Sequence, residues 1–120
     1  VMSMGPSVVV VKRGEHGALL FYKDTVFSAP ALPLRRVVDP TGAGDSFAGG
    51  FMGYLAASGD LSLAGFRRAA VVGSVMGSFA VESFGLDGIS SLTQDDIDDR
   101  FRMMTDLVQF DPLSEQNPLL

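Results

Sequence analysis

One segment constrains the fold of this chain more than any other: residues 37–51, with the sequence VVDPTGAGDSFAGGF. It begins in a β-branched run, passes through a glycine-rich turn and continues into an apolar pattern with helical spacing. Proline fixes one φ angle, and glycine adopts the positive φ that a tight turn can require. The segment therefore predicts a strand-to-helix junction. In α/β sheets, such junctions at the carboxyl ends of strands are where ligands bind.

The remainder of the chain reads as strands followed by helices. The Val run near the start shows no polar alternation, which is typical of a strand covered on both faces in a parallel sheet. Lys23 and Asp24 separate two strand-like runs and predict a hairpin turn. Asp60 is expected to cap the second helix, and Thr93 with Asp96 has the spacing of a capping box. Strands are expected over residues 7–13, 17–22, 25–29 and 35–39, and helices over residues 44–58, 60–81 and 93–110.

Composition excludes several classes of protein. With 120 residues, 47% of them hydrophobic, the chain is expected to form one globular domain. It has no Cys, which excludes disulfides, thiolate metal sites and a Cys nucleophile and fits a cytoplasmic location. Residues 39–120 hold four basic and twelve acidic side chains, so a nucleic-acid partner is not expected. No apolar run is long enough for a bilayer and no signal peptide is visible, so no membrane partner is expected either.

The glycine-rich turn allows two interpretations. In the first, the glycines only form the turn and Asp45 only helps the helix to start. In the second, the nearly bare backbone of Gly42, Ala43 and Gly44 presents amides to an anion at the positive end of the helix. A carboxylate at Asp45, favoured by the same field, could then accept a proton from a substrate hydroxyl. Positioning, charge stabilisation and a base are what phosphoryl transfer requires.

Other motifs with glycine-rich turns do not match this segment. A Walker loop needs Lys after its last glycine, where this chain has Asp45. A dinucleotide fingerprint needs a small residue at the position of Phe47. The nucleophile elbow G-x-S-x-G is absent, and His16 is the one histidine, which argues against a Ser-His-Asp site.

Two motifs together resemble a known family. DPTGAGDSFAGGF, residues 39–51, resembles the C-terminal signature of the ribokinase-like, phosphofructokinase-B type carbohydrate kinases. VVKRGEHGALLF, residues 10–21, resembles the family's strand–Gly-x-x-Gly–strand element. The resemblance implies an α/β fold: the C-terminal part of a Rossmann-type three-layer α/β/α fold, in which sheet strands and a β-hairpin are followed by three helices.

The resemblance also implies an activity and a set of residues. It implies ATP-dependent phosphorylation of a hydroxymethyl group on a sugar or nucleoside, with magnesium, Mg2+, accompanying the ATP. Asp45 would be the base, and the amides of Gly42, Ala43 and Gly44 would form the anion hole. Lys12, Gly14 and Gly17, with Gly44, fall where the family contacts the nucleotide, although a charge at a strand end such as Lys12 is often simply solvated. A monovalent cation, K+, would be held by residues at the positions of Asp39, Thr41, Ala80, Ser83, Gly85 and Ser90.

Family members are more than twice as long as this chain, and the chain begins at Val1 and soon enters a strand-like run. We therefore expect residues 1–110 to be the C-terminal nucleotide-binding and catalytic portion of a sugar kinase, and residues 111–120 to be a tail. The sugar-binding half and the lid would lie outside this chain, so that the isolated fragment would be inactive. The full-length protein would be a homodimer by the same resemblance. Two alternatives remain: a nucleotide-binding regulatory or pseudo-enzyme module without transfer activity, and a purely structural α/β domain.

Overall fold

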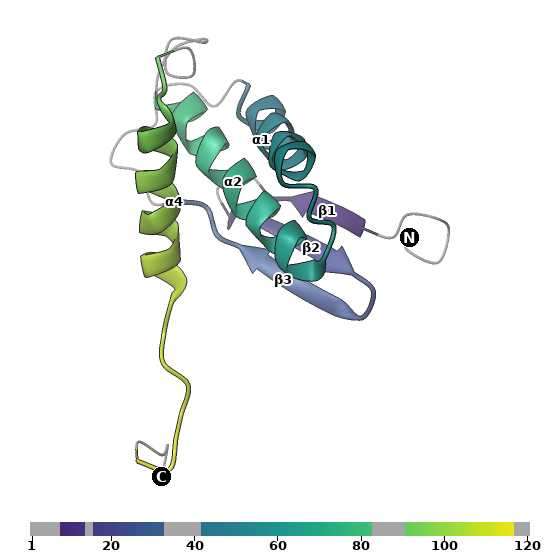
Figure 1. The fold of residues 1–120 in the computed structure, drawn as a ribbon, viewed down its shortest axis with the longest axis vertical. Helices are drawn as coiled ribbons and strands as arrows, with labels where there is room; N and C mark the ends of the chain where they lie inside the picture. Colours follow the sequence, from purple (N-terminus) through teal and green to yellow (C-terminus); the bar gives the residue numbers. More distant parts are fainter. Residues whose placement is uncertain (1–7, 14–15, 33–41, 83–90, 117–120) are drawn as a thin grey trace.

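The computed structural model describes residues 8–13, 16–32, 42–82 and 91–116. Three strands come first, followed by three helices (Figure 1). The strands are β1 (Val8–Lys12), β2 (Ala18–Tyr22) and β3 (Thr25–Ala29), and the helices are α1 (Ala43–Ser58), α2 (Leu63–Val81) and α4 (Gln94–Val108). This order confirms the expected α/β arrangement. The strand expected over residues 35–39 lies outside the described residues.

The three strands form an antiparallel sheet in the order β1-β2-β3. Strands β2 and β3 make the predicted hairpin, with Tyr22 opposite Thr25 and a turn at Lys23, whose φ is 52°. The expectation for β1 is not met within the described residues: β1 pairs antiparallel with β2, and Val11 is 44% exposed. A run of valines reports β-propensity and hydrophobicity, but it does not encode the direction of the neighbouring strand.

Helix α2 crosses one face of the sheet, with α1 along one of its sides and α4 along the other (Figure 1). Small residues allow α1 and α2 to lie close together. A β-carbon on Gly73 would be 2.9 Å from the carbonyl oxygen of Phe47, and one on Gly50 would be 3.1 Å from the carbonyl oxygen of Val72. The aromatic rings of Phe47, Phe51, Phe66 and Tyr22 continue this contact toward the sheet.

The starts of α2 and α4 depend on side-chain caps. At α2 the cap is Ser62, whose hydroxyl accepts a hydrogen bond from the Gly65 amide, so the expected cap at Asp60 was wrong. Asp60 instead accepts hydrogen bonds from the amide and the hydroxyl of Ser62 and so supports the residue that caps the helix. At α4 the capping box of Thr93 and Asp96 is confirmed, with both reciprocal hydrogen bonds present.

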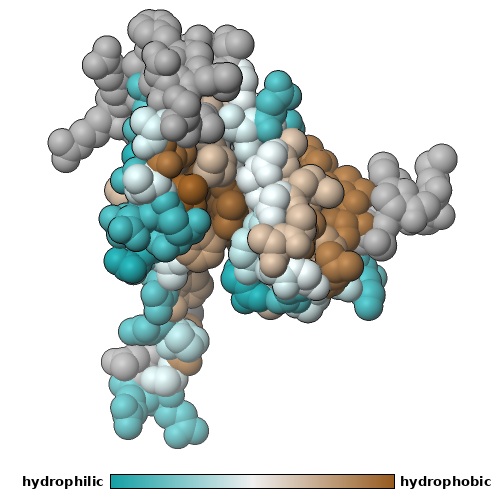
Figure 2. All heavy atoms as spheres, turned by 45° about the horizontal axis from the view of Figure 1, so that its top comes forward, coloured by the Kyte–Doolittle hydropathy of each residue, from teal (hydrophilic) through white to brown (hydrophobic). Residues whose placement is uncertain are grey.

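A small apolar core joins α2 to α4. Leu32, Val75 and Met104 are its buried members, and Phe79 and Phe101 are among the side chains packed against it. No helix within the described parts of the chain is long and apolar enough to cross a membrane. Hydrophobic surface lies at the end of the molecule where β1 begins (Figure 2).

Candidate active site at the start of helix α1

The candidate site is the first turn of α1. Gly42 is its N-cap and has the left-handed conformation, with φ 85° and ψ −6°. Its carbonyl oxygen accepts the first intrahelical hydrogen bond, from the amide of Ser46, at 2.9 Å. The preceding amides of the turn, those of Ala43, Gly44 and Asp45, therefore have no partner within the helix and carry its positive end. Two of these residues, Ala43 and Gly44, belong to the predicted anion hole of Gly42, Ala43 and Gly44, which stays a prediction.

Asp45 lies in the first turn of α1 and is exposed. It is not the N-cap, since Gly42 occupies that position. Within the described residues, the Asp45 carboxylate has neither a hydrogen-bond partner nor an ion-pair partner. A carboxylate at this position, beside amides that have no partner within the helix, could accept a proton from a hydroxyl group next to a bound anion.

Lys12 connects the family motif at residues 10–21 with the one at residues 39–51. It is the last residue of β1, and its ammonium nitrogen lies 3.4 Å from the carbonyl oxygen of Gly44, 32 positions further along the chain. A β-carbon on Gly44 would be 3.0 Å from the same nitrogen, so glycine at this position leaves room for the lysine. The positive end of α1 thus has a second positive charge beside it, as a phosphate site would need.

Gly17 has a structural reason to be glycine. Its φ is 86°, and a β-carbon there would overlap the carbonyl oxygen of Ala29 and lie 2.9 Å from the amide nitrogen of Ala31. Gly17 is buried, and its carbonyl oxygen accepts a hydrogen bond from the amide of Arg13 at 2.7 Å. Packing alone therefore accounts for this glycine, and its predicted contact with a nucleotide stays a prediction.

Of the six residues predicted for the monovalent cation, the structure describes Ala80 alone. It is buried in the last turn of α2, where helical carbonyl groups have no intrahelical partner. The described part of the chain contains no group of three or more His, Cys, Asp or Glu that could hold a metal ion. The remaining predicted residues lie outside the described ranges: Gly14, Asp39, Thr41, Ser83, Gly85 and Ser90.

The last turns of α2 pack against the first turn of α1. A β-carbon on Gly77 would be 3.4 Å from the carbonyl oxygen of Ala43, an ordinary van der Waals contact. One turn earlier, Gly73 lies against Phe47. The end of α2 therefore packs directly against the turn that contains Ala43.

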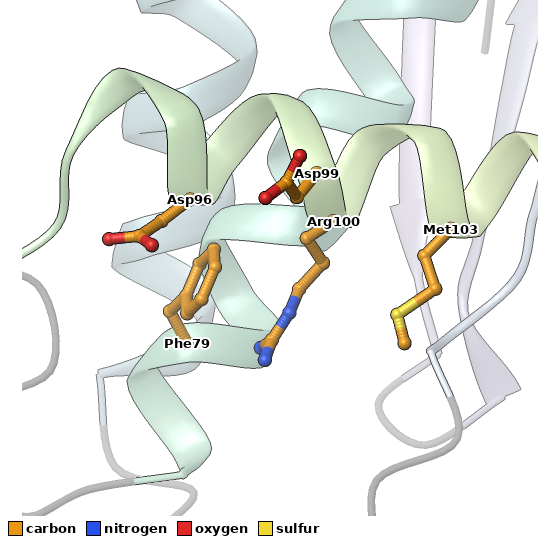
Figure 3. Close-up of a pocket in the computed structure, with 5 residues that line it drawn as sticks. All are labelled: Phe79, Asp96, Asp99, Arg100 and Met103. Carbon is orange, nitrogen blue, oxygen red and sulfur yellow. The ribbon is translucent and has the colours of Figure 1, made fainter.

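A second cluster, which the sequence did not predict, surrounds that end of α2. Arg100 of α4 reaches across to Ser78, Phe79 and Glu82, and Figure 3 shows its guanidinium beside the Phe79 ring. A shallow hollow of about 240 Å³ lies here, away from the first turn of α1, lined by Phe79, Asp96, Asp99, Arg100 and Met103. A sequence signal for this cluster would have required knowing that α4 packs on α2.

Asp60 and Arg68 are a further charged pair, in the α1–α2 connection and on α2. Their carboxylate and guanidinium groups are 2.6 Å apart. The pKa of Asp60 lies below its ordinary value, first because of the hydrogen bonds from Ser62 and then because of Arg68. The pKa of Arg68 is raised, first by its hydrogen bond to the hydroxyl of Tyr54. This ion pair links the α1–α2 connection to α2 and includes no residue of the candidate site.

Comparison with known proteins gives a consistent picture. The model of the pfkB family of carbohydrate kinases matches residues 1–92. A nucleoside kinase from Methanothermobacter thermautotrophicus is 44% identical over 82 residues, which are 68% of this chain and 24% of that protein.

Two solved structures are similar in fold. The nucleoside kinase of Burkholderia thailandensis in complex with inosine has a TM-score of 0.69 at 33% identity, over 82% of this chain and 30% of that one. Aminoimidazole riboside kinase from Salmonella enterica, with aminoimidazole riboside and an ATP analogue, has a TM-score of 0.70 at 30% identity, over 83% of this chain and 33% of that one. The chain therefore spans a quarter to a third of the length of these proteins.

Proposed function

Since the chain belongs to the pfkB family of carbohydrate kinases, we propose that it supplies the phosphoryl-transfer site of an ATP-dependent kinase. The acceptor is a hydroxymethyl group of a sugar or nucleoside. The observation that carries this proposal is the first turn of α1, which holds amides without a partner in the helix and the exposed Asp45, and whose Gly44 carbonyl oxygen the Lys12 ammonium approaches. Amides and ammonium suit a phosphate group, and the carboxylate suits a hydroxyl that must lose its proton.

Each residue then has a role in the transfer step. Asp45 accepts the proton of the acceptor hydroxyl, whose oxygen forms a bond to the γ-phosphorus as the bond between that phosphorus and the ADP oxygen breaks. The amides of Gly42, Ala43 and Gly44 stabilise the negative charge on the migrating phosphoryl group. Lys12 binds phosphate oxygens, and Gly14 and Gly17 belong to the nucleotide-binding element that β1 leads into.

Two metal ions belong to the proposal. Mg2+ would enter with ATP and would neutralise phosphate charge, and by the family resemblance its protein ligands would lie in the half of the full-length protein outside this chain. K+ would add positive charge beside the anion hole, held by Asp39, Thr41, Ala80, Ser83, Gly85 and Ser90. The position of Ala80 fits this role because the end of α2 lies against the first turn of α1, where Gly77 meets Ala43.

The names of the similar proteins favour a nucleoside among the possible acceptors. All three are named as kinases of nucleosides or of a riboside, and one is bound to inosine. Because this chain spans only part of their length, residues beyond it would complete the acceptor pocket. A homodimer and a cytoplasmic location of the full-length protein belong to the same proposal, and we expect the isolated 120-residue fragment to be inactive.

The test uses the full-length protein that contains this chain, with Asp45→Asn as the variant and Asp106→Asn, an exposed aspartate of α4, as the control. Phosphorylation of a panel of nucleosides and sugars is measured with ATP and Mg2+, and ATP affinity is measured by calorimetry. We expect Asp45→Asn to lower kcat by about 10²- to 10⁴-fold, the usual contribution of a general base. ATP affinity should stay within a few-fold of the wild-type value, and the control should behave as the wild type.

The alternatives give different results in the same experiment. A nucleotide-binding regulatory or pseudo-enzyme module would bind ATP and transfer no phosphate to any acceptor of the panel. A purely structural domain would show neither property. Near-normal turnover by Asp45→Asn would exclude Asp45 as the base even if the protein is a kinase.

A further inference from the structure

Arg100 makes three kinds of contact with the end of α2. Its guanidinium forms a two-point ion pair with the Glu82 carboxylate, at 2.8 and 3.2 Å. It donates a further hydrogen bond to the Ser78 hydroxyl at 3.1 Å, and it stacks 3.8 Å from the centre of the Phe79 ring. We name these four residues the Arg100 cluster; Figure 3 shows Arg100 extending from α4 toward Phe79 of α2.

The cluster is mostly shielded from water. The side chain of Arg100 is 18% exposed and that of Glu82 is 34% exposed, whereas Arg102 and Asp99 on the same helix are 73% and 75% exposed. Partial burial makes the Arg100 contacts stronger and more specific than a surface ion pair. Arg100 also lies beyond residue 92, where the match to the family model ends.

The cluster fixes the part of α2 that touches the candidate site. Glu82 is the C-cap of α2. Ser78, one turn earlier, donates its own hydrogen bond to the Val75 carbonyl oxygen at 2.6 Å. Because Arg100 bonds to both Ser78 and Glu82, it holds the last turns of the helix at two points. Gly77 immediately precedes Ser78 in the sequence, and a β-carbon on it would be 3.4 Å from the carbonyl oxygen of Ala43 in the first turn of α1. A positive guanidinium at the end of α2 is also favoured by the helix dipole.

From these contacts we propose that Arg100 is a positioning residue for the phosphate site: by holding the last turns of α2, it keeps the first turn of α1 in place. The inference rests on the proposed function for its effect on ATP, but its structural part can be tested without any activity. Helix α4 does not depend on Arg100 for its attachment, since Ile97, Phe101 and Met104 pack in the core that joins it to α2. Removal of Arg100 should therefore loosen the end of α2 without detaching α4.

The test compares Arg100→Met with Arg102→Met in the full-length protein. Arg102 is the matched control because it has the same side chain on the same helix but, among the described residues, pairs only with Asp99, at 3.6 Å. The first readout is amide hydrogen exchange in peptides that cover residues 42–50, which include the hydrogen-bonded amide of Ser46. The second is the Kd for ATP. We expect Arg100→Met to speed exchange in residues 42–50 but not in residues 51–58, and to raise the Kd about three- to thirtyfold.

Two more variants keep the test decisive. Arg100→Lys retains one charge and should give intermediate values, so it replaces Arg100→Met if that variant does not fold. Glu82→Gln should reproduce part of the effect, and the double variant should be no worse than Arg100→Met alone, since both changes remove one ion pair.

The outcomes separate this inference from the proposed function. If Arg100→Met leaves exchange over residues 42–50 at the wild-type rate, the inference is overturned, whatever the enzyme does. It is also overturned if exchange rises there and the Kd for ATP does not. If the wild type binds ATP but transfers no phosphate, the kinase assignment fails while the exchange rates and the Kd still decide the role of Arg100.

Discussion

The ammonium nitrogen of Lys12 lies 3.4 Å from the carbonyl oxygen of Gly44, so the end of β1 and the start of α1 meet at one point. The distance is long for a strong hydrogen bond, and the side chain is exposed. The lysine therefore lies near the first-turn amides of α1 without a strong bond to the Gly44 carbonyl oxygen, and it can turn toward an anion. This contact joins the two family motifs in space.

We expect Lys12→Ala to weaken ATP binding in the full-length protein by about tenfold, the lower end of what a charged hydrogen bond contributes. The loss follows from removing the one ammonium group that the described structure brings to the first turn of α1. Lys23→Ala is the control, because Lys23 lies in the β2–β3 turn over the Tyr22 ring. Calorimetry with ATP measures both, and equal affinities for the two variants would show that Lys12 is only solvated.

Gly73→Ala should destabilise the protein by about 1–3 kcal/mol, the usual cost of forcing extra volume into a packed contact. Its β-carbon would lie 2.9 Å from the Phe47 carbonyl oxygen and 3.0 Å from the ring, so α1 would have to move away from α2. Gly49→Ala is the matched control: it makes the same change inside a helix, but its β-carbon would meet nothing within 4 Å. The control should be stabilising by up to about 1 kcal/mol.

Denaturant unfolding of the full-length protein measures both glycine variants. If Gly73→Ala proved as stable as Gly49→Ala, the two helices would have room to spare and the close approach at Gly73 would not position α1.

Thr93→Ala should lower the free energy of unfolding by about 1 kcal/mol, because it removes the hydroxyl that accepts a hydrogen bond from the Asp96 amide in the capping box. Thr105→Ala in the same helix is the control. The Thr105 hydroxyl donates a hydrogen bond to the Phe101 carbonyl oxygen one turn earlier and caps no helix end, and alanine favours the helix interior. Thr105→Ala should therefore be neutral or slightly stabilising, and equal losses for the two variants would contradict the role of the cap.

Local signals account for what the sequence predicted correctly. The hairpin at Lys23 and Asp24, the capping box of Thr93 and Asp96, and the left-handed conformation of Gly42 before α1 each depend on residues a few positions apart. Such signals can be read from one sequence because the backbone geometry of a turn or cap selects particular side chains.

Long-range pairing accounts for most of what the sequence did not predict. The valines of β1 gave a strand but not its antiparallel neighbour, and nothing near Arg100 indicated that it would bind Glu82, 18 positions away. The cap of α2 was missed by two positions. Asp60 and Ser62 are both residue types that cap helices well, but α2 begins where the Ser62 hydroxyl accepts a hydrogen bond from the Gly65 amide. In the site, the turn at Gly42 could be predicted locally, whereas the approach of Lys12 to it was suggested only by family resemblance.

The hydrogen bonds and the ion pair of Asp60 predict that the stability of the fold depends on pH. The pKa of Asp60 is lowered from its ordinary value of 3.8, first by hydrogen bonds from Ser62 and then by Arg68. A carboxyl group whose pKa is lower in the folded state stabilises that state above the unfolded pKa, and the contribution is lost as the pH falls through the folded pKa. Asp60→Asn should therefore unfold at a lower temperature than the wild type at pH 7, and the difference should shrink as the pH falls below 3.8.

Ser62→Ala and Arg68→Met divide this effect between the two kinds of partner. Because the bonds from Ser62 are the larger cause, Ser62→Ala should raise the pKa of Asp60 more than Arg68→Met does, although the Ser62 amide still donates to the carboxylate at 3.0 Å. An NMR titration of the Asp60 carboxyl carbon in each variant measures the order. A larger rise in Arg68→Met would mean that the ion pair at 2.6 Å, rather than the turn at Ser62, holds the α1–α2 connection.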